Sequence, residues 1–271
     1  MMFLYLMAAL LFGVVLAYFV LEYSFLVPAP KGLPVLMYHK VSESVPDGLT
    51  VTSAQFDQQM HYLRKKGYRP LHFSDLMQLE KCKDPLPRGA IVITFDDAYT
   101  NFRDHALPIL KKHGFPATLF LPVAFIGKTN IWDRGSEPIL GAADLKMMAN
   151  NDLVEMGLHS FLHRNYRDMA PEDIAEDLKN CRETLNYYGI PYFGVLAYPY
   201  GGHPGKDPDM RNPTAMLFEQ EGINYALRIG NRINRWPFRN RYELCRIDVR
   251  GTDTFCKFRI KVKKGRTKRF A

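Results

Sequence analysis

The sequence has few cysteines, and no two of them are spaced as a clustered site requires. Cys82, Cys181, Cys245 and Cys256 are the only four in 271 residues, and none forms a C-x-x-C pair. Cys181 fits the apolar face of a helix, so we expect buried free thiols, with a disulfide between Cys245 and Cys256 as the alternative. Thiols in this state do not indicate a compartment.

Internal repeats and low-complexity segments are also absent. The apolar and charged fractions, 47% and 24%, are those of an ordinary globular protein, which excludes wholesale disorder. A chain of 271 residues can bury one large core, and α/β barrels of this size are commonly single domains.

Charge is missing from the start of the chain, where Met1 to Leu21 contain no Asp, Glu, Lys or Arg. A helix of about 20 such residues is long enough to cross a bilayer core of roughly 30 Å. A cleavable signal peptide usually has a basic start and a shorter apolar run, so the pattern favours an uncleaved anchor over a signal peptide or a buried core helix. We therefore predict a transmembrane anchor at residues 1–26, a Pro/Gly linker at 27–33 and a domain at 34–271.

The net charge of +8 comes from 36 basic and 28 acidic residues, and much of it lies near the carboxyl end. Basic and apolar residues alternate from Cys256 to Lys263, which predicts a strand with one buried and one solvated face. Such a strand is either a charge-protected sheet edge or a surface that attracts anionic lipid or an acidic polymer. Nucleic acid is not an expected partner, because no aromatic-interleaved basic stripe accompanies the segment.

Strand-like apolar runs alternate with helical patterns along the rest of the chain. Strands are expected at LPVLMYH, YRPLHF, AIVITFDD, ATLFLP, LVEMGLHS, FGVLAYPYG, YALRIG and ELCRIDV. Helices are expected at 53–66, in the segment that ends at Gly114, at 171–188 and before Gly222. This order predicts an α/β fold with a mostly parallel sheet, open or closed into a barrel, whose reactive groups lie at the carboxyl ends of the strands.

Two adjacent carboxylates, Asp96 and Asp97, follow the apolar strand IVITF at one such end. Partly desolvated neighbouring carboxylates repel each other unless a cation or a proton relieves them. A solvated surface pair is the alternative, but it would have turn residues on both sides. The pair therefore indicates a site where Asp97 binds a metal ion and Asp96 acts as a base.

His159 and His163 lie four positions apart at the end of another predicted strand. This spacing lets two imidazoles converge on one ion, although spaced His pairs also arise by chance. No Glu follows the first His, which excludes the helical H-E-x-x-H arrangement of zinc proteases. Two His and one Asp make the ligand count of a catalytic divalent metal site with open positions.

Two further residues follow predicted strands. His39 ends the first strand, where it is either a hydrogen-bonded structural residue or a general acid for a leaving amine. In VLAYPYGG, a strand runs into a turn that Pro199 fixes, and the backbone N–H of Tyr200 there suits a developing oxyanion. As an isolated motif this segment indicates only a turn.

Together TFDDAYTNF, HSFLH and AYPYGG, in this order and spacing, resemble the polysaccharide deacetylases of the NodB-homology type, carbohydrate esterase family 4. The resemblance implies a distorted (β/α) barrel of about seven strands and metal-dependent removal of N-acetyl groups from N-acetylhexosamine polymers. It implies that Asp96 is the catalytic base, that the Tyr200 N–H serves the oxyanion and that Ser160 braces the His-bearing loop. The implied ligands of a divalent metal, most often Zn²⁺ with Co²⁺ or Ni²⁺ as alternatives, are Asp97, His159 and His163.

Three features depart from the family pattern. Ala98 replaces the usual Gly after the paired Asp, a change that is tolerated if its backbone is not left-handed. Ala197 stands where an Arg commonly holds the catalytic base, and the late leucine-x-histidine motif is missing. In the subgroup that resembles poly-N-acetylglucosamine deacetylases, an early Met-Tyr-His segment supplies the general acid. LMYH matches that segment and assigns the role to His39.

The sequence thus predicts a membrane-anchored hydrolase of carbon–nitrogen bonds that deacetylates an N-acetylglucosamine-type polysaccharide on the extracytoplasmic side. The alternative from another class is a catalytically impaired carbohydrate-binding relative, which Ala197 keeps open. A carboxylate-pair glycosidase fits poorly, because its two acids flank a bond at about 5 Å or more. Trp132 is either a platform for a sugar ring or a buried residue.

Overall fold

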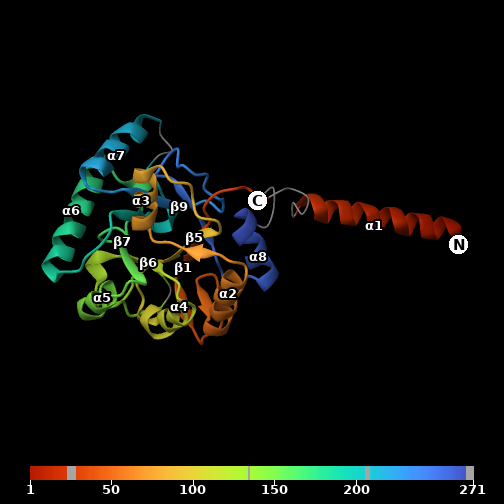
Figure 1. Cartoon of the computed structure of the whole chain (residues 1–271), viewed down its shortest axis with the longest axis horizontal. Coiled ribbons are helices and arrows are strands. Elements are labelled where there is room, and N and C mark those ends of the chain that lie inside the picture. The colour runs from red at the N-terminus through yellow and green to blue at the C-terminus, as the bar shows by residue number, and fades with distance from the viewer. Residues whose placement is uncertain (23–28, 134, 205–207, 267–271) are drawn as a thin grey trace.

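The fold is an α/β barrel, seen in a computed structural model that describes residues 1–22, 29–133, 135–204 and 208–266 (Figure 1). The strands of its wall are β1 (Val35–Tyr38), β5 (Ala90–Phe95), β6 (Ala117–Leu121), β7 (Val154–Leu158), β8 (Val195–Ala197), β9 (Tyr225–Ile229) and β10 (Leu244–Asp248). All pairings between them are parallel, and β1 pairs with both β5 and β10, which closes the barrel. The prediction of a parallel barrel of about seven strands is confirmed.

Three short strands lie outside this wall. The segment YRPLHF contributes only β4 (Arg69–Pro70), which pairs with the amino end of β5. The strands β2 (Lys40–Ser42) and β3 (Thr50–Thr52) form a separate two-stranded sheet that the sequence did not predict.

Helices surround the barrel (Figure 1). They are α2 (Ser53–Lys65), α3 (Phe73–Cys82), α4 (Leu107–His113), α5 (Ala142–Ala149), α6 (Pro171–Tyr188), α7 (Pro208–Gln220) and α8 (Phe255–Lys264). Turns of π or 3₁₀ type occur at Phe102–Ala106, Val123–Phe125, Tyr166–Asp168 and Pro199–Gly201. The predictions of α2, α4, α6 and α7 are confirmed, whereas α3 and α5 were not predicted.

Helix α3 depends on a contact that local sequence does not show. Its first backbone N–H groups, those of Phe73 and Ser74, donate to the carboxylate of Glu155 on the distant strand β7. A carboxylate at a helix amino terminus satisfies unpaired N–H groups and favours the helix dipole. Phe73 and Leu76 then pack into a cluster with strand residues such as Val92.

The carboxyl-terminal prediction was wrong, because residues 256–263 lie in helix α8 rather than in a strand. Thr254 caps the helix by accepting a hydrogen bond from the Lys257 backbone N–H, and Phe258 and Val262, one helical turn apart, are buried. Lys261 is buried beside them and donates to the carbonyl of Asp248. Because Lys261 lies on the buried face of the helix, basic and apolar residues alternate in the sequence, and this alternation was misread as a strand.

The cysteine prediction is confirmed in part. All four are free; Cys181 and Cys245 are buried, whereas Cys82 and Cys256 are exposed. Cys256 is exposed because α8 turns it away from the face that packs on the barrel.

Helix α1 (Met2–Glu22) extends away from the barrel (Figure 1). Among the residues that the structure describes, no helix is both long enough and apolar enough to span a bilayer, so the predicted transmembrane anchor is not confirmed. The predicted anchor end and linker start, at residues 26 and 27, lie outside the described residues.

Candidate active site

The alternation of side chains along strands β5 and β1 brings Asp96 and His39 into one site. In β5, Ile91 and Ile93 belong to the larger core cluster and Val92 belongs to the other, so alternate residues face opposite sides of the wall. Asp96 lies four residues after Val92 and therefore faces the same side of the wall. His39 lies four residues after Val35 in β1 and faces that side for the same reason.

Strand β10 adds a residue that the sequence analysis missed. Arg246 lies two residues after Leu244, a member of the smaller cluster, so both side chains face the same side of the wall. Arg246 is 1% exposed. Its guanidinium donates two hydrogen bonds to Asp96, at 2.5 Å to Oδ1 and 2.8 Å to Oδ2. The sequence pattern that could have revealed Arg246 is an Arg at an inward-facing position of the strand LCRID. Arg246 thus holds Asp96 from a different strand than the one that carries Ala197.

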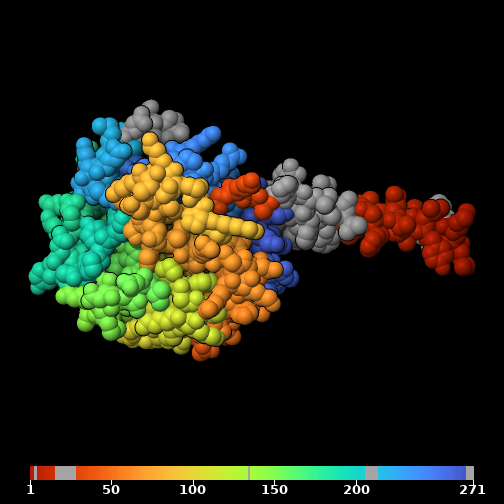
Figure 2. All heavy atoms as spheres, viewed as in Figure 1, coloured from red at the N-terminus to blue at the C-terminus, as the bar shows by residue number. Residues whose placement is uncertain are grey.

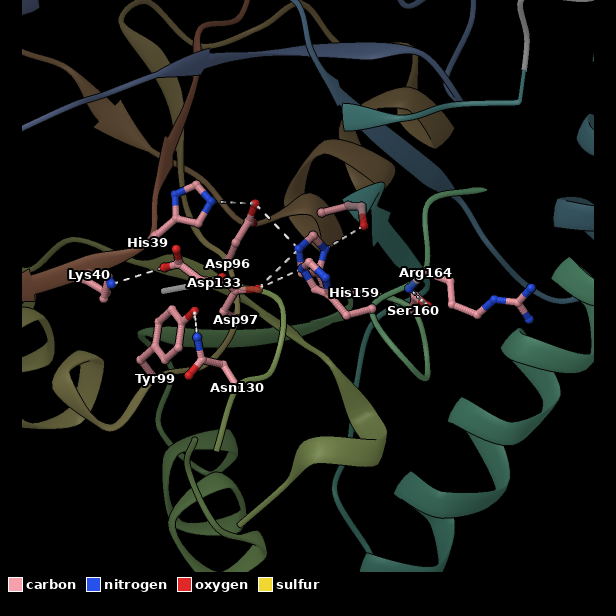
Figure 3. A network of polar contacts seen from close by, with 12 residues as sticks. His39, Lys40, Asp96, Asp97, Tyr99, Asn130, Asp133, His159, Ser160 and Arg164 are labelled. Carbon is pink, nitrogen blue, oxygen red and sulfur yellow. Dashed lines mark hydrogen bonds and ion pairs between the residues drawn. The ribbon is translucent and has the colours of Figure 1, made fainter. Parts of the chain in front are cut away.

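The surroundings of Asp96 keep its carboxylate ionised. Burial by itself would raise the pKa of Asp96, but the charges of Arg246, His159 and His39 outweigh it and hold the pKa below its usual value. Nε2 of His39 lies 3.8 Å and Nε2 of His159 lies 3.9 Å from Asp96 Oδ2 (Figure 3). The structure therefore brings His39 and Asp96 to the same point, as the sequence predicts.

Asp97, His159 and His163 converge beside this pair, and all three are buried. Nε2 of His159 lies 3.5 Å and Nε2 of His163 lies 3.2 Å from Asp97 Oδ1. One potential ligand atom from each residue lies within 4.8 Å of the others. The predicted metal-binding set is thus assembled.

The donor chemistry of this set fits a cation. Nδ1 of His159 lies 2.7 Å from the carbonyl oxygen of Ala197, so Nδ1 carries the hydrogen and Nε2 keeps its lone pair toward Asp97. Burial lowers the pKa of His159 to about 4, so this ring is neutral at pH 7. Asp97 Oδ1 is buried without a hydrogen-bond donor. Lone pairs that face one another in a buried site are relieved by a divalent metal ion.

Left-handed backbone is concentrated at this site. Of the seven non-glycine residues with positive φ among those described, five lie in the three site loops, and they are Asp97, Ala98, Ser160, His163 and Tyr200. Left-handed backbone costs a residue with a Cβ on the order of 1–2 kcal/mol. Ala98 has φ 50°, which is left-handed, so the replacement of Gly by Ala at this position carries backbone strain.

Asp177 on α6 braces the loop that carries the two His, and the sequence analysis did not identify it. Its carboxylate is buried and accepts hydrogen bonds from the Ser160 hydroxyl (2.7 Å), the Phe161 backbone N–H (2.7 Å) and the Tyr166 hydroxyl (3.1 Å). Ser160 Oγ also accepts a hydrogen bond from the Arg164 N–H. Ser160 thus braces the loop as predicted, and Asp177 anchors Ser160.

We expect Asp177→Asn to weaken Zn²⁺ binding by about 10- to 100-fold, the usual effect of changing a residue that orients metal ligands. The Asn side chain has the same shape, but its NH₂ group faces donors and loses at least one of the three hydrogen bonds. Competition with a chelator measures the affinity. Glu183→Gln, an exposed acid on the same helix, is the matched control and should leave the affinity unchanged. Equal affinities in the two variants would contradict the bracing role.

The site opens into a cleft of about 380 Å³. Trp132 lies on its wall, half-buried and stacked on the His163 ring at a centroid distance of 4.1 Å. Tyr200 is 59% exposed, and its ring lies edge-on to the His163 ring at a centroid distance of 4.9 Å. Both aromatic residues therefore border the position that a substrate must occupy to reach Asp96.

Comparisons with known proteins agree with this geometry. A family model described as polysaccharide deacetylase matches residues 83–212, which include the Asp pair, both His and the Tyr200 turn. Over 173 residues the chain is 28% identical to YxkH of Bacillus subtilis (strain 168), whose name describes it as a polysaccharide deacetylase; the match covers 64% of this chain and 58% of that protein. Residues 83–212 are therefore similar to the polysaccharide deacetylase family.

Two further proteins are similar to this chain. The poly-beta-1,6-N-acetyl-D-glucosamine N-deacetylase of Staphylococcus epidermidis is 28% identical over 160 residues, which are 56% of this chain and 54% of that protein. The solved structure of IcaB from Ammonifex degensii shares the fold with a TM-score of 0.69 at 22% identity, covering 86% of this chain and 97% of that one. The chain spans a little more than half the length of the two curated relatives.

Proposed function

We propose that this chain hydrolyses N-acetyl groups from an N-acetylglucosamine-type polysaccharide with the help of a divalent metal ion. One observation carries the proposal: an Asp/His/His ligand set lies directly beside a buried carboxylate that Arg246 holds ionised. A carboxylate base beside such a ligand set is the arrangement that metal-assisted hydrolysis requires.

Each residue at the cleft has a separate task in this reaction. Asp97, His159 and His163 would hold a divalent cation, which would supply the Lewis acid that polarises the acetamide carbonyl and makes water more acidic. Asp96 accepts the proton of the attacking water at Oδ2, the oxygen that faces His39 and His159. His39 donates a proton to the departing amine, and the Tyr200 backbone N–H stabilises the oxyanion.

The binding-only alternative loses its main support. That alternative depended on the missing Arg at Ala197, because a base without its cationic partner is poorly tuned. Arg246 supplies the cation with two hydrogen bonds. The proposal therefore favours turnover over a purely carbohydrate-binding role.

The substrate and location extend this proposal. The name of the Staphylococcus epidermidis relative supports a β-1,6-linked N-acetylglucosamine polymer. Zn²⁺ is the metal we propose, with Co²⁺ and Ni²⁺ as alternatives. Since such polymers lie outside the cytoplasm, we propose that the domain faces the extracytoplasmic side and that the charge-free segment before Glu22 anchors it.

The test follows acetate release by the full chain, stripped of metal with a chelator and then given Zn²⁺, Co²⁺ or Ni²⁺. The substrates are N-acetylglucosamine oligomers with β-1,6 or β-1,4 linkage. We expect no release without metal and recovery with it, and faster release from the β-1,6 oligomers. Metal binding with no acetate from either oligomer would instead support the carbohydrate-binding alternative.

A further inference from the structure

Three segments of this chain contain basic residues and no acidic ones. Between Gly222 and Tyr242 there is no Asp or Glu, but there are five arginines. The chain after Asp253, which includes α8, also contains no Asp or Glu. Neither does the stretch between Glu22 and Glu43, which includes Lys31. In a chain with 28 acidic residues, three such segments leave a local excess of positive charge if they meet.

The fold brings the three segments together. Leu33, just before β1, exchanges two backbone hydrogen bonds with Asn234, at 2.7 and 3.1 Å, which places Lys31 near Arg235. Gly265, just after α8, lies so close to Arg232 that a Cβ at Gly265 would be 2.6 Å from the Arg232 Cα. The end of α8 therefore lies against the same loop that pairs with the start of the barrel.

We call this surface the basic patch and define it as Lys31, Arg232, Arg235, Lys263 and Arg266. All five are exposed, and none forms an ion pair with any residue that the structure describes. By contrast, Arg228 and Arg241 in the same connection pair with Glu243 and Glu80.

Crowding of positive charge is visible next to the patch. The pKa of Lys264 is held below its usual value by partial burial and by the neighbouring charge of Lys263. The five cations of the basic patch, which form no ion pair with the described residues, favour an external polyanion.

The position of the patch indicates which polyanion. Lys31 lies just before β1, at the amino end of the barrel, whereas Asn231, beside Arg232, bonds to Arg246 and Asp248 toward the carboxyl end of β10, so the patch runs along the side of the barrel. Helix α1 leads into Lys31, and its described side chains, such as Leu10, Leu11 and Phe12, are apolar and exposed. Figures 1 and 2 show α8 on the side of the barrel from which α1 extends.

We propose that the basic patch binds the headgroups of an anionic lipid surface, with α1 in contact with the same surface. A basic cluster beside an uncharged apolar helix combines the two interactions that hold proteins on membranes, electrostatic attraction and apolar burial. A soluble acidic polymer would use the charges but leave α1 without a partner. The proposal does not depend on the chemistry of the cleft.

The test measures hydrogen–deuterium exchange of the full chain in the presence of vesicles. One set of vesicles is pure phosphatidylcholine, and the other contains roughly 30% phosphatidylglycerol, whose negative surface potential attracts basic clusters. We expect slower exchange at residues 231–236 and 257–266 only with the anionic vesicles. The triple variant Arg232→Gln, Arg235→Gln, Lys263→Gln should need about 100-fold more anionic lipid for half-maximal protection, because each cation near such a surface contributes roughly a fivefold factor. A matched triple variant, Lys111→Gln, Lys146→Gln, Lys179→Gln, alters exposed cations on α4, α5 and α6 and should behave as the original chain.

Three results would overturn the proposal. The first is equal protection with neutral and anionic vesicles, which would leave α1 alone as the lipid contact. The second is equal weakening by the two triple variants, which would indicate net charge rather than the patch. The third is protection by soluble polyglutamate, at the same concentration of negative charge, together with none by anionic vesicles. Acetate release is measured separately and bears on the cleft only.

Discussion

Asp96→Asn is expected to lower kcat/KM for acetate release by roughly 10³-fold, the usual scale for loss of a general base. The Asn side chain keeps the shape of Asp96 but does not accept a proton at neutral pH. Because Asp97, His159 and His163 would supply the ligand atoms, Zn²⁺ affinity should fall far less than activity. Acetate release and chelator competition on the same preparation measure the two effects.

The control for this variant is Asp104→Asn, an exposed acid that pairs with Arg103 away from the cleft. It should retain full activity and full metal affinity. If Asp96→Asn retained activity within about tenfold, which is below the usual contribution of a general base, another group would have to accept the proton. A parallel loss of metal and activity would instead make Asp96 a metal ligand.

Arg246→Met is expected to destabilise the fold by about 3–5 kcal/mol, because it leaves the buried Asp96 carboxylate without its cation. The guanidinium and the carboxylate are 1% and 3% exposed, so water does not replace the lost partner. For a chain of this size the thermal midpoint should fall on the order of 10 °C. Thermal unfolding followed by circular dichroism measures the change.

The loss should depend on pH with a defined sign. In the folded protein Arg246 helps to hold the pKa of Asp96 below its usual value, so the pair stabilises the fold above the unfolded pKa of about 4. That contribution is lost as the pH falls through the lower folded pKa. The original chain and the Arg246→Met variant should therefore differ most at neutral pH and converge in acid. The acid limb of the kcat/KM profile should move to higher pH in the variant.

A double variant separates the ion pair from general packing. Arg246→Met combined with Asp96→Asn removes both charges and should be more stable than Arg246→Met alone. Strictly additive losses would mean that Arg246 stabilises the barrel through packing, such as its position over the Phe120 ring, rather than through Asp96.

The sequence predicts the parts of this site that local patterns encode. Asp96, Asp97 and His159 follow apolar strands directly, and parallel strands place their carboxyl ends at the same edge, so convergence followed from the strand order. Arg246 was missed because its role depends on which face of β10 points inward and on which strand closes the barrel. Asp177 was missed because its hydrogen-bond partners lie in a loop 11 to 17 residues away, which a local pattern does not show.

The wrong prediction at α8 and the left-handed backbone at Ala98 have a different origin. The buried Lys261 interrupts the apolar stripe of α8, and its ammonium group is satisfied by the distant Asp248 and by Asp253, so a local periodicity did not reveal the helix. Ala98 adopts a backbone that its residue type disfavours, because the loop around the Asp pair requires it. In both cases tertiary contacts overrule local preference.

The closure of β1 against both β5 and β10 also ties the site to the order in which the chain is made. During synthesis β1 and β5 emerge first with His39 and Asp96, and β10 brings Arg246 150 residues after Asp96. Until then the wall has a gap between β1 and β9, and Asp96 has no guanidinium beside it. The last strand therefore completes the wall and the ion pair in one event, and a chain that stops short of β10 has neither.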